Sequence, residues 1–269
     1  MSPPQRSASA RVRREPPRFR RVSVRRIESA SPRLVRVTFA GQELDDLTVE
    51  QPAASVRLLI SAPGAPELVM PTWNGNEFLL PDATRPTIRT FTPRRVDPEA
   101  LEMDLEIVLH GSGAASEWAD AAEVGFPAAV SGPGRGYTID GDAPGFLLAG
   151  DETAIPAISQ LLETLPTGTA VQVHIETGHP DARLALPEHP DATVEWHELP
   201  TGAASGDSLL DAVRGADIAR GMRVWAAGEA AAVQRIRRHL FQDRELPRAQ
   251  ATVRGYWKHG RSGGADDDT

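Results

Sequence analysis

The sequence predicts an antiparallel β-barrel followed by a Rossmann-like parallel α/β domain. Across residues 19–140, short apolar runs alternate with polar residues and are interrupted by proline and glycine, which favours a small closed barrel. After Gly141, strand-like and helix-like segments alternate, which is typical of a parallel sheet. The 269 residues suit two modest domains, which we place at 18–142 and 143–261, with DGDAPG (140–145) as the linker.

Three segments of the first domain have strand patterns. RLVRVTFAG (33–41) alternates and ends at a glycine turn, and VRLLIS (56–61) is a short apolar run. The clearest segment is LEMDLEIVLH (101–110), which we expect to form a half-buried antiparallel strand. Its two faces consist of Leu101, Met103, Leu105, Ile107 and Leu109 against Glu102, Asp104, Glu106 and His110.

The second domain alternates between strand and helix patterns. The expected strands are 146–150, 170–176, 192–199, 223–228 and 248–257, and the expected helices are 152–165, 206–216 and 229–242. We therefore expect a parallel sheet covered by helices on both faces. In such a sheet, a cofactor can lie in the crevice at the carboxyl ends of the strands.

Composition and charge exclude several classes of protein. The chain has no cysteine, which excludes disulfides, thiolate nucleophiles, cysteine-bound zinc and ordinary iron–sulfur clusters, so redox chemistry needs a bound organic cofactor. A net charge of −8 argues against a nucleic-acid binder. There is no run of about 20 apolar residues and no signal-peptide pattern, so we expect a soluble cytoplasmic protein with no membrane span.

The two ends of the chain carry opposite charges. Residues 1–26 hold nine arginines against the single Glu15, and the other end carries three consecutive aspartates at 266–268. Both ends lack the apolar residues that a packed core needs. We therefore predict a disordered basic tail at 1–17 and a disordered acidic tail at 262–269.

The motif IRTFTPRR (88–95) places a cation, hydroxyls and a flat ring together where a strand is expected to end. Arg89, Thr90, Phe91 and Thr92 are candidates for holding a ligand. The alternative is that Arg89 and Thr92 lie on the solvated face of an edge strand that Pro93 ends.

A second motif, HGSGAASEWADAA (110–122), predicts a phosphate site. Gly111 and Gly113 permit a tight turn, and Ser116 is the expected N-cap of a helix over 117–122. A helix N-terminus with free amides and a nearby hydroxyl suits a phosphate. The alternative is an ordinary serine cap, with Trp118 in the core.

Two strand-to-helix turns of the second domain carry acidic residues. In GDETAIPAI (150–158) only Gly150 stands where a Rossmann glycine motif would lie, and the acidic turn would repel a pyrophosphate. This turn can therefore face a cofactor without holding its phosphates; alternatively, Asp151 to Thr153 simply cap the helix. In WAAGE (225–229), Gly228 ends a strand and Glu229 opens a helix.

The last strand ends in a mixture of aromatic and basic residues, RGYWKHGR (254–261). Its basic residues could hold an anionic ligand and its aromatic pair, Tyr256 and Trp257, could stack on a flat one, although a charged strand face is the simpler alternative. The patterns HxxxH, HExxH, GxSxG and GxxxxGK[ST] are absent from the sequence, so we expect no protein-bound catalytic metal.

The order of these motifs resembles the siderophore-interacting protein family. An Arg-x-aromatic-Thr element is followed by HGSGAASEWA, GDETAIPAI, WAAGE and RGYWxxG, and the resemblance covers residues 19–261. Members of this family are FAD-containing ferric-siderophore reductases related to the ferredoxin–NADP reductase superfamily. The resemblance implies an FAD-binding barrel followed by an NAD(P)H-binding-like α/β domain.

By this resemblance, Arg89 would bind an FAD phosphate, Phe91 would pack on the ring system and Thr92 would hydrogen-bond the isoalloxazine edge. Gly113 to Ser116 would form the pyrophosphate motif. Phe91 departs from the family's usual tyrosine, and Ala114 departs from a common proline. The full predicted FAD set is Arg89, Thr90, Phe91, Thr92, His110, Gly111, Gly113, Ala115, Ser116, Trp118, Asp151, Thr153 and Trp257.

The expected electron donor is NADH or NADPH, with ferredoxin as an alternative because family members differ in their donor. Gly228 and Glu229 stand where nicotinamide-using relatives carry a cysteine-containing motif. Glu176, at the end of an expected strand, could hydrogen-bond a ribose 2′-hydroxyl and would then favour NADH. It could equally be a solvated strand end.

The resemblance implies that the donor reduces FAD, which passes electrons singly to the iron of a ferric siderophore. No side chain need act as acid or nucleophile. Because net-negative ferric siderophores favour a basic surface, the predicted docking residues are Arg254, Lys258, His259 and Arg261.

Two other functions fit the same sequence. One is an NAD(P)H-dependent flavin or quinone oxidoreductase on this fold, and the other is a flavin- or siderophore-binding module without turnover. We expect a monomer, because the sequence has no heptad repeat and no long apolar edge.

Overall fold

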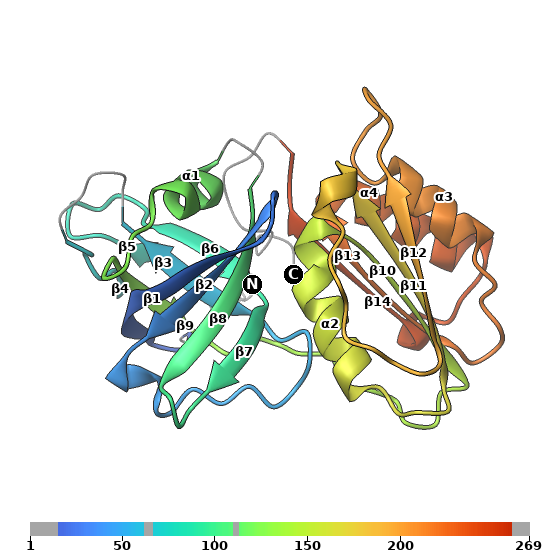
Figure 1. Ribbon diagram of the computed structural model, residues 1–269, viewed down its shortest axis with the longest axis horizontal. Helices are drawn as coiled ribbons and strands as arrows, with labels where there is room; N and C mark the ends of the chain where they lie inside the picture. The colour runs from blue at the N-terminus through green and yellow to red at the C-terminus, as the bar shows by residue number, and fades with distance from the viewer. Residues whose placement is uncertain (1–15, 62–66, 110–112, 260–269) are drawn as a thin grey trace, which may run out of the picture.

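The computed structural model describes residues 16–61, 67–109 and 113–259, which form two main sheets with their helices (Figure 1). The predicted fold class, an antiparallel barrel followed by a parallel α/β domain, is confirmed. Apart from positions 16 and 17, the two expected tails lie outside the described residues, as do His110, Gly111 and Arg261.

The first domain is a seven-stranded antiparallel sheet that curls into a half-barrel. Its strands pair in the order β6-β3-β9-β1-β2-β8-β7. Among the described strands, the edge strands β6 and β7 are joined through Thr92 rather than paired, so the barrel is open where we expected a closed one. The strands are β1 (Phe19–Ser31), β2 (Leu34–Ala40), β3 (Val56–Ile60), β6 (Thr87–Phe91), β7 (Pro93–Asp97), β8 (Glu102–Val108) and β9 (Pro127–Ser131). Smaller elements are η1 (Gln42–Leu44), the hairpin of β4 (Thr72–Trp73) and β5 (Phe78–Leu79), and the helix α1 (Ala114–Ala121).

The second domain is a five-stranded parallel sheet in the order β12-β11-β10-β13-β14. Its strands are β10 (Gly145–Asp151), β11 (Ala170–Thr177), β12 (Ala192–Glu198), β13 (Arg223–Glu229) and β14 (Ala251–Trp257). The helical segments are η2 (Glu152–Ala154), α2 (Ile155–Thr164), η3 (Pro180–Ala182), α3 (Asp207–Gly215), α4 (Ala230–Arg238), the π-helical turn η4 (His239–Asp243) and η5 (Arg248–Gln250).

Helices cover both faces of the parallel sheet, as the alternating pattern predicted. The helix α2 packs on the face that looks toward the barrel, and α3 and α4 pack on the opposite face (Figure 1). The strand order reverses between β10 and β13. In open α/β sheets, ligands bind outside the carboxyl ends of the strands at such a reversal.

Strand β8 is buried on both faces, which corrects the expectation of a half-buried strand. Asp104 and Glu106 are only 7 % and 6 % exposed. The Thr38 hydroxyl lies 2.7 Å from Asp104, and the Arg36 guanidinium donates to Glu106 at 2.5 Å. Both partners lie on the neighbouring strand β2, so the polar face of β8 is covered by its own hydrogen-bonding partners.

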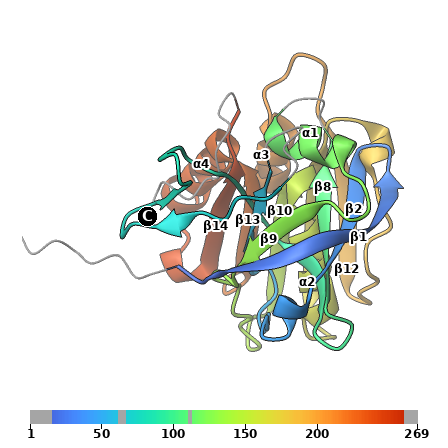
Figure 2. The same cartoon turned by 90° about the vertical axis from the view of Figure 1, so that its left-hand side faces the viewer.

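Hydrogen bonds fix the two domains against each other. The Gln160 side chain of α2 accepts from the Ala53 N–H at 2.8 Å and donates to the Pro93 carbonyl at 2.6 Å. Arg33, in the turn between β1 and β2, donates to Glu152 at 3.0 Å. Figure 2 shows the barrel from its outer side, with α1 at one end of its strands. The corner between β6 and β7 is therefore held beside α2.

Candidate functional site

The corner of the half-barrel meets the carboxyl edge of the parallel sheet at Thr92. This residue lies between β6 and β7 and is 6 % exposed. Its hydroxyl oxygen lies 3.5 Å from the phenol oxygen of Tyr256 on β14. The predicted FAD set includes Trp257 but omits its neighbour Tyr256. Because successive residues of a strand point to opposite faces, the alternation along GYW could have shown that these two side chains lie in different surroundings.

Arg89 is a half-buried cation without an acidic partner among the described residues. Its guanidinium donates to the carbonyl of the preceding Ile88 at 2.8 Å. Burial lowers the pKa of Arg89, because the charged form is taken out of water. All five residues of β6 are partly buried, so this edge strand is not the fully solvated face of the simpler alternative. A guanidinium in this environment fits an anionic group such as a phosphate.

The helix α1 begins earlier than predicted, which corrects the assignment of Ser116 as its N-cap. The N-cap is Gly113, whose φ of 90° is open to glycine and strained for most other residues, and no side chain caps it. Ser116 lies inside the first turn and is 1 % exposed. The amides of Ala114 and Ala115 belong to the turn in which a helix offers no acceptor of its own. The N-terminus of the helix therefore lies nearer the glycine turn than expected, and a phosphate site there stays a prediction.

Trp118 lies in the barrel core, as its alternative reading predicted. It is 5 % exposed and stacks on Phe39 with ring centroids 5.9 Å apart. Its indole N–H is buried with no hydrogen-bond partner in the described part of the chain. A contact between Trp118 and FAD stays a prediction.

Asp151 joins three strands at the carboxyl edge of the parallel sheet. One carboxylate oxygen accepts from the Thr153 N–H at 2.9 Å, which confirms that it caps η2. The other oxygen accepts from the Glu229 N–H at 2.9 Å and from the Trp257 indole at 2.8 Å. Burial raises the pKa of Asp151, although these hydrogen bonds act in the opposite direction.

Gly228 makes room for this carboxylate. Its φ is 153°, and a Cβ added there would lie 2.6 Å from Asp151 Oδ2. The strand therefore requires glycine at the position where the sequence predicted only a strand end. The WAAGE and GDETAIPAI motifs are therefore in direct contact, through Gly228 of the first and Asp151 of the second.

Two further carboxylates cap helices at the same edge. Glu229 accepts from the Ala232 N–H at 2.8 Å at the start of α4, as predicted. Glu176 is 4 % exposed and accepts from the amides of Gly206 and Leu209 at 2.6 and 2.9 Å, at the start of α3. Burial raises the pKa of Glu176. The alternative that Glu176 is a solvated strand end is therefore wrong. Its contact with a ribose hydroxyl stays a prediction, and its carboxylate already accepts hydrogen bonds from the start of α3.

The predicted basic docking residues do not lie together. The Arg254 guanidinium donates to the carbonyls of Ala53, Arg135 and Gly136 at 3.0, 3.1 and 2.6 Å, so it clamps β14 to the barrel. Lys258 and His259 are exposed just beyond β14. Because the Arg254 guanidinium is bound at the domain interface, the docking prediction now rests, among the described residues, on Lys258 and His259.

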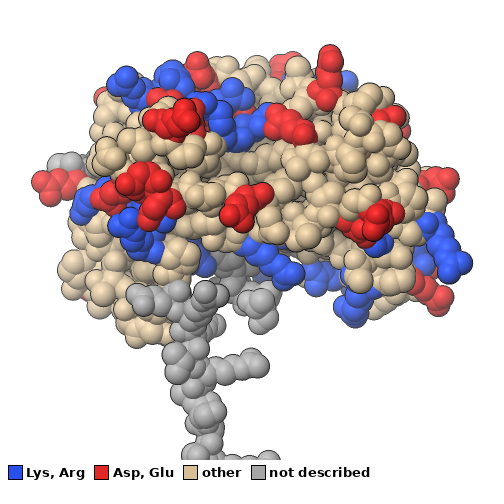
Figure 3. All heavy atoms as spheres, turned by 90° about the horizontal axis from the view of Figure 1, so that it is seen from below, with Lys and Arg blue, Asp and Glu red and all other residues tan. Residues whose placement is uncertain are grey.

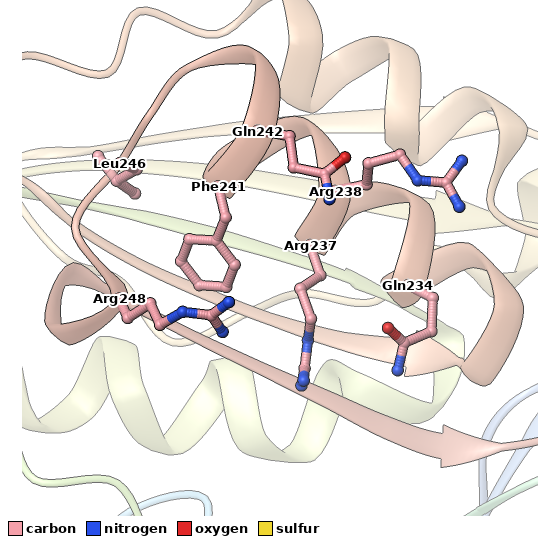
Figure 4. A pocket seen from close by; sticks show the side chains of 7 residues that line it. All are labelled: Gln234, Arg237, Arg238, Phe241, Gln242, Leu246 and Arg248. Carbon is pink, nitrogen blue, oxygen red and sulfur yellow. The ribbon is translucent and has the colours of Figure 1, made fainter.

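Other surface features lie away from this junction. A shallow pocket of about 350 Å³ beside α4 is lined by three arginines, of which Arg248 lies 5.2 Å over the Phe241 ring (Figure 4). On the face shown in Figure 3, acidic and basic side chains are interspersed. Within the ranges that the structure describes, no helix is long and apolar enough to cross a membrane.

An antiparallel half-barrel whose corner meets the carboxyl edge of a parallel sheet defines a two-domain fold of the ferredoxin-reductase type. The fold matches that of phthalate dioxygenase reductase with a TM-score of 0.58 and 15 % identity, over 91 % of this chain and 69 % of that one. The model of the siderophore-interacting FAD-binding domain matches residues 23–137, and that of the siderophore-interacting protein matches residues 143–260. The chain belongs to the siderophore-interacting protein family, as the order of its motifs indicated, and its FAD-binding domain implies FAD as cofactor.

Two relatives illustrate this membership. A siderophore utilization protein from T. fusca superposes with a TM-score of 0.81 and 32 % identity, over 92 % of this chain and 95 % of that one. The ferric vibriobactin reductase ViuB of Vibrio cholerae is 25 % identical over 238 residues, which is 86 % of each chain.

Proposed function

We propose that the chain is an FAD-dependent ferric-siderophore reductase that releases Fe(II) in the cytoplasm for iron acquisition. The observation that carries the proposal is Arg89, a half-buried guanidinium without an acid partner in the described residues, on the strand that Thr92 directly follows. Membership of the siderophore-interacting family and the similarity to the ferric vibriobactin reductase ViuB support the same reaction.

In this proposal the barrel holds the cofactor. Arg89 binds an FAD phosphate, and the first turn of α1 donates amide hydrogens to the pyrophosphate. Thr92, whose hydroxyl oxygen lies 3.5 Å from that of Tyr256, would hydrogen-bond the isoalloxazine edge. When bound, FAD accepts an electron pair from the donor and delivers single electrons to Fe(III).

The substrate is an iron chelate with hard, anionic oxygen ligands. Such ligands bind Fe(III) more strongly than Fe(II), so reduction weakens the chelate and frees the metal. Lys258 and His259 lie exposed beyond β14, next to Trp257, and attract an anionic chelate to that edge. No proton transfer by a side chain is required for this step.

The donor is NADH or NADPH, with reduced ferredoxin as the alternative. In Rossmann domains, a dinucleotide pyrophosphate lies at a helix N-terminus. Here Asp151, Glu176 and Glu229 already cap the helical segments that follow β10, β12 and β13. A nicotinamide donor would therefore have to bind through other groups at this edge. Anaerobic bleaching of the bound flavin by each of the three donors in parallel would identify it.

A donor-free experiment tests the proposed reaction directly. The FAD-loaded protein is reduced by light under anaerobic conditions and then mixed with a ferric siderophore, with ferric citrate or with a quinone. We expect reoxidation at least about 10-fold faster with the siderophore than with either competitor. Equal rates would favour a general flavin or quinone reductase. No reoxidation by iron would indicate a binding module.

A further inference from the structure

Two histidines and a glutamate lie together on the edge of the parallel sheet, away from the β10, β13 and β14 ends that form the candidate site. His174 lies on β11, and Glu195 and His197 lie on the neighbouring edge strand β12. His174 is paired in register with Glu195, and His197 follows two residues later on the same face. The sequence search missed the cluster because it looked for helical spacings such as HxxxH, whereas two parallel strands supply these ligands.

The ligand atoms of the three side chains are within coordination reach of one another. His174 Nδ1 lies 3.0 Å from His197 Nε2 and 4.0 Å from Glu195 Oε2, and all three ligand atoms lie within 4.8 Å of one another. Tetrahedral zinc with bonds of about 2.0 Å places neighbouring ligand atoms about 3.3 Å apart. Small rotations of the two β12 side chains would bring the three atoms to this spacing.

The burial of the three residues divides them into a fixed ligand and two adjustable ones. The His174 side chain is 8 % exposed and is fixed within the sheet, whereas the Glu195 side chain is 58 % exposed. His197 is partly buried and lies between them in exposure. A ligand set on rigid strands is preorganised, and its open side faces solvent, so an ion has a path of entry.

Beyond their contacts with one another, the ligand atoms of these side chains have no hydrogen-bond or ion-pair partner among the described residues. Among the described residues, Glu195 pairs with no arginine or lysine, and its Oε2 lies 4.0 Å from His174 Nδ1. The second ring nitrogen of His174 is buried with no hydrogen-bond partner in those residues. The imidazole rings, 5.2 Å apart between centroids, are therefore tied only to each other and to Glu195.

We propose that His174, Glu195 and His197 form a binding site for a divalent transition-metal ion. Two imidazoles and a carboxylate are ligands suited to Zn²⁺, Fe²⁺, Co²⁺ and Ni²⁺, and three protein ligands leave a coordination position for water. The site is separate from the flavin site and does not depend on the proposed reductase function. The alternative is a hydrogen bond between two neutral histidines with no metal role.

Calorimetric titration of Zn²⁺ into the chelator-treated, FAD-loaded full chain tests the site. We expect one ion per chain with a dissociation constant in the micromolar range or below, and Co²⁺ should give the visible bands of a low-coordinate nitrogen and oxygen site. His197→Ala should weaken binding by about 100-fold and Glu195→Gln by about 10-fold. His179→Ala removes an exposed imidazole 3.4 Å from Asp181 and should change binding less than 2-fold.

Two results would overturn the proposal. One is the absence of Zn²⁺ binding to the wild-type chain, and the other is binding that His197→Ala and Glu195→Gln leave unchanged. Glu195 is exposed, so its substitution tests the site even if His197→Ala fails to fold. Because the titration reads metal binding alone, its outcome is distinguishable from that of the flavin and siderophore experiments.

Discussion

The two domains differ in the sign of the enclosed side-chain charge that lacks an oppositely charged partner among the described residues. At the corner of the half-barrel, Arg89 is a half-buried cation with no acidic partner in the described residues. At the carboxyl edge of the α/β sheet, Asp151, Glu176 and Glu229 are enclosed by amide donors and have no cationic partner in that part of the chain. The barrel therefore offers a cation that can bind an external anion. At the α/β edge, the helix amides that could bind an anion already donate to carboxylates of the chain itself.

This difference shows which domain can hold the phosphates of a cofactor. A helix N-terminus attracts one anion at close range, and an internal carboxylate at that position excludes an external phosphate. The N-cap of α1 is Gly113, which supplies no carboxylate, and the acidic contact recorded at this turn is from Glu117 Oε1, which accepts from the Gly113 N–H at 3.2 Å. We therefore propose that the barrel, rather than the α/β edge, holds the FAD phosphates.

The largest expected effect is on stability and comes from displacing the Asp151 carboxylate at the carboxyl edge of the α/β sheet. Gly228→Ala would place a methyl group 2.6 Å from Asp151 Oδ2 at a φ of 153°. We expect a loss of about 2–4 kcal/mol in the free energy of unfolding, from backbone strain and the displaced carboxylate. Urea unfolding measures it. Gly215→Ala, where the added Cβ meets nothing within 4 Å, is the control and should change stability by less than about 1 kcal/mol.

The next effect tests the cation of the barrel. Arg89→Ala should weaken FAD binding by about 10- to 100-fold, because one charge-assisted contact to phosphate is lost. Titration of the stripped protein with FAD, followed by flavin fluorescence, gives the dissociation constants. Arg85→Ala removes a nearby, exposed guanidinium paired with Glu77 and should retain wild-type affinity. Equal losses in both variants would mean that Arg89 has no specific role.

A smaller effect should appear in the pH dependence of stability. Burial raises the pKa of Asp151. A carboxyl with a raised pKa in the folded state contributes stability below its unfolded-state pKa, and loses it as pH rises through the folded-state value. The advantage of wild type over Asp151→Asn should therefore shrink as pH rises from acid to neutral. The exposed Asp211→Asn serves as the control for loss of one charge, and a gap that widens with pH would contradict the account.

The smallest effect concerns substrate docking. Lys258→Glu should raise KM for an anionic ferric siderophore about 2- to 5-fold with FAD content unchanged, because exposed charges act weakly through water. The effect should fade as salt is added. A KM that is unchanged at low salt would remove Lys258 from the docking surface.

The sequence predicted those features that depend on neighbours in the chain. Alternation gave the strands, and the turn chemistry of GDETAIPAI and WAAGE gave the caps by Asp151 and Glu229. Ser116 was misplaced because Gly113 can start the helix itself, three residues earlier than a serine cap would require.

Features that join distant residues were not visible in the sequence. The burial of Glu106 depends on Arg36, which lies 70 residues away, and the clamp by Arg254 spans 201 residues to Ala53. The cluster of His174 with His197 likewise needs the register of two strands. Periodicity reports which face of an element is apolar, whereas these contacts depend on which elements are packed together.

The central claim is tested most directly by the visible absorption spectrum of the purified chain, followed anaerobically through addition of a donor and then of a ferric siderophore. The account predicts the bands of oxidised flavin, their loss with NADH, NADPH or reduced ferredoxin, and their return when the ferric siderophore is added. A colourless protein that FAD does not reconstitute, although folded, would contradict it.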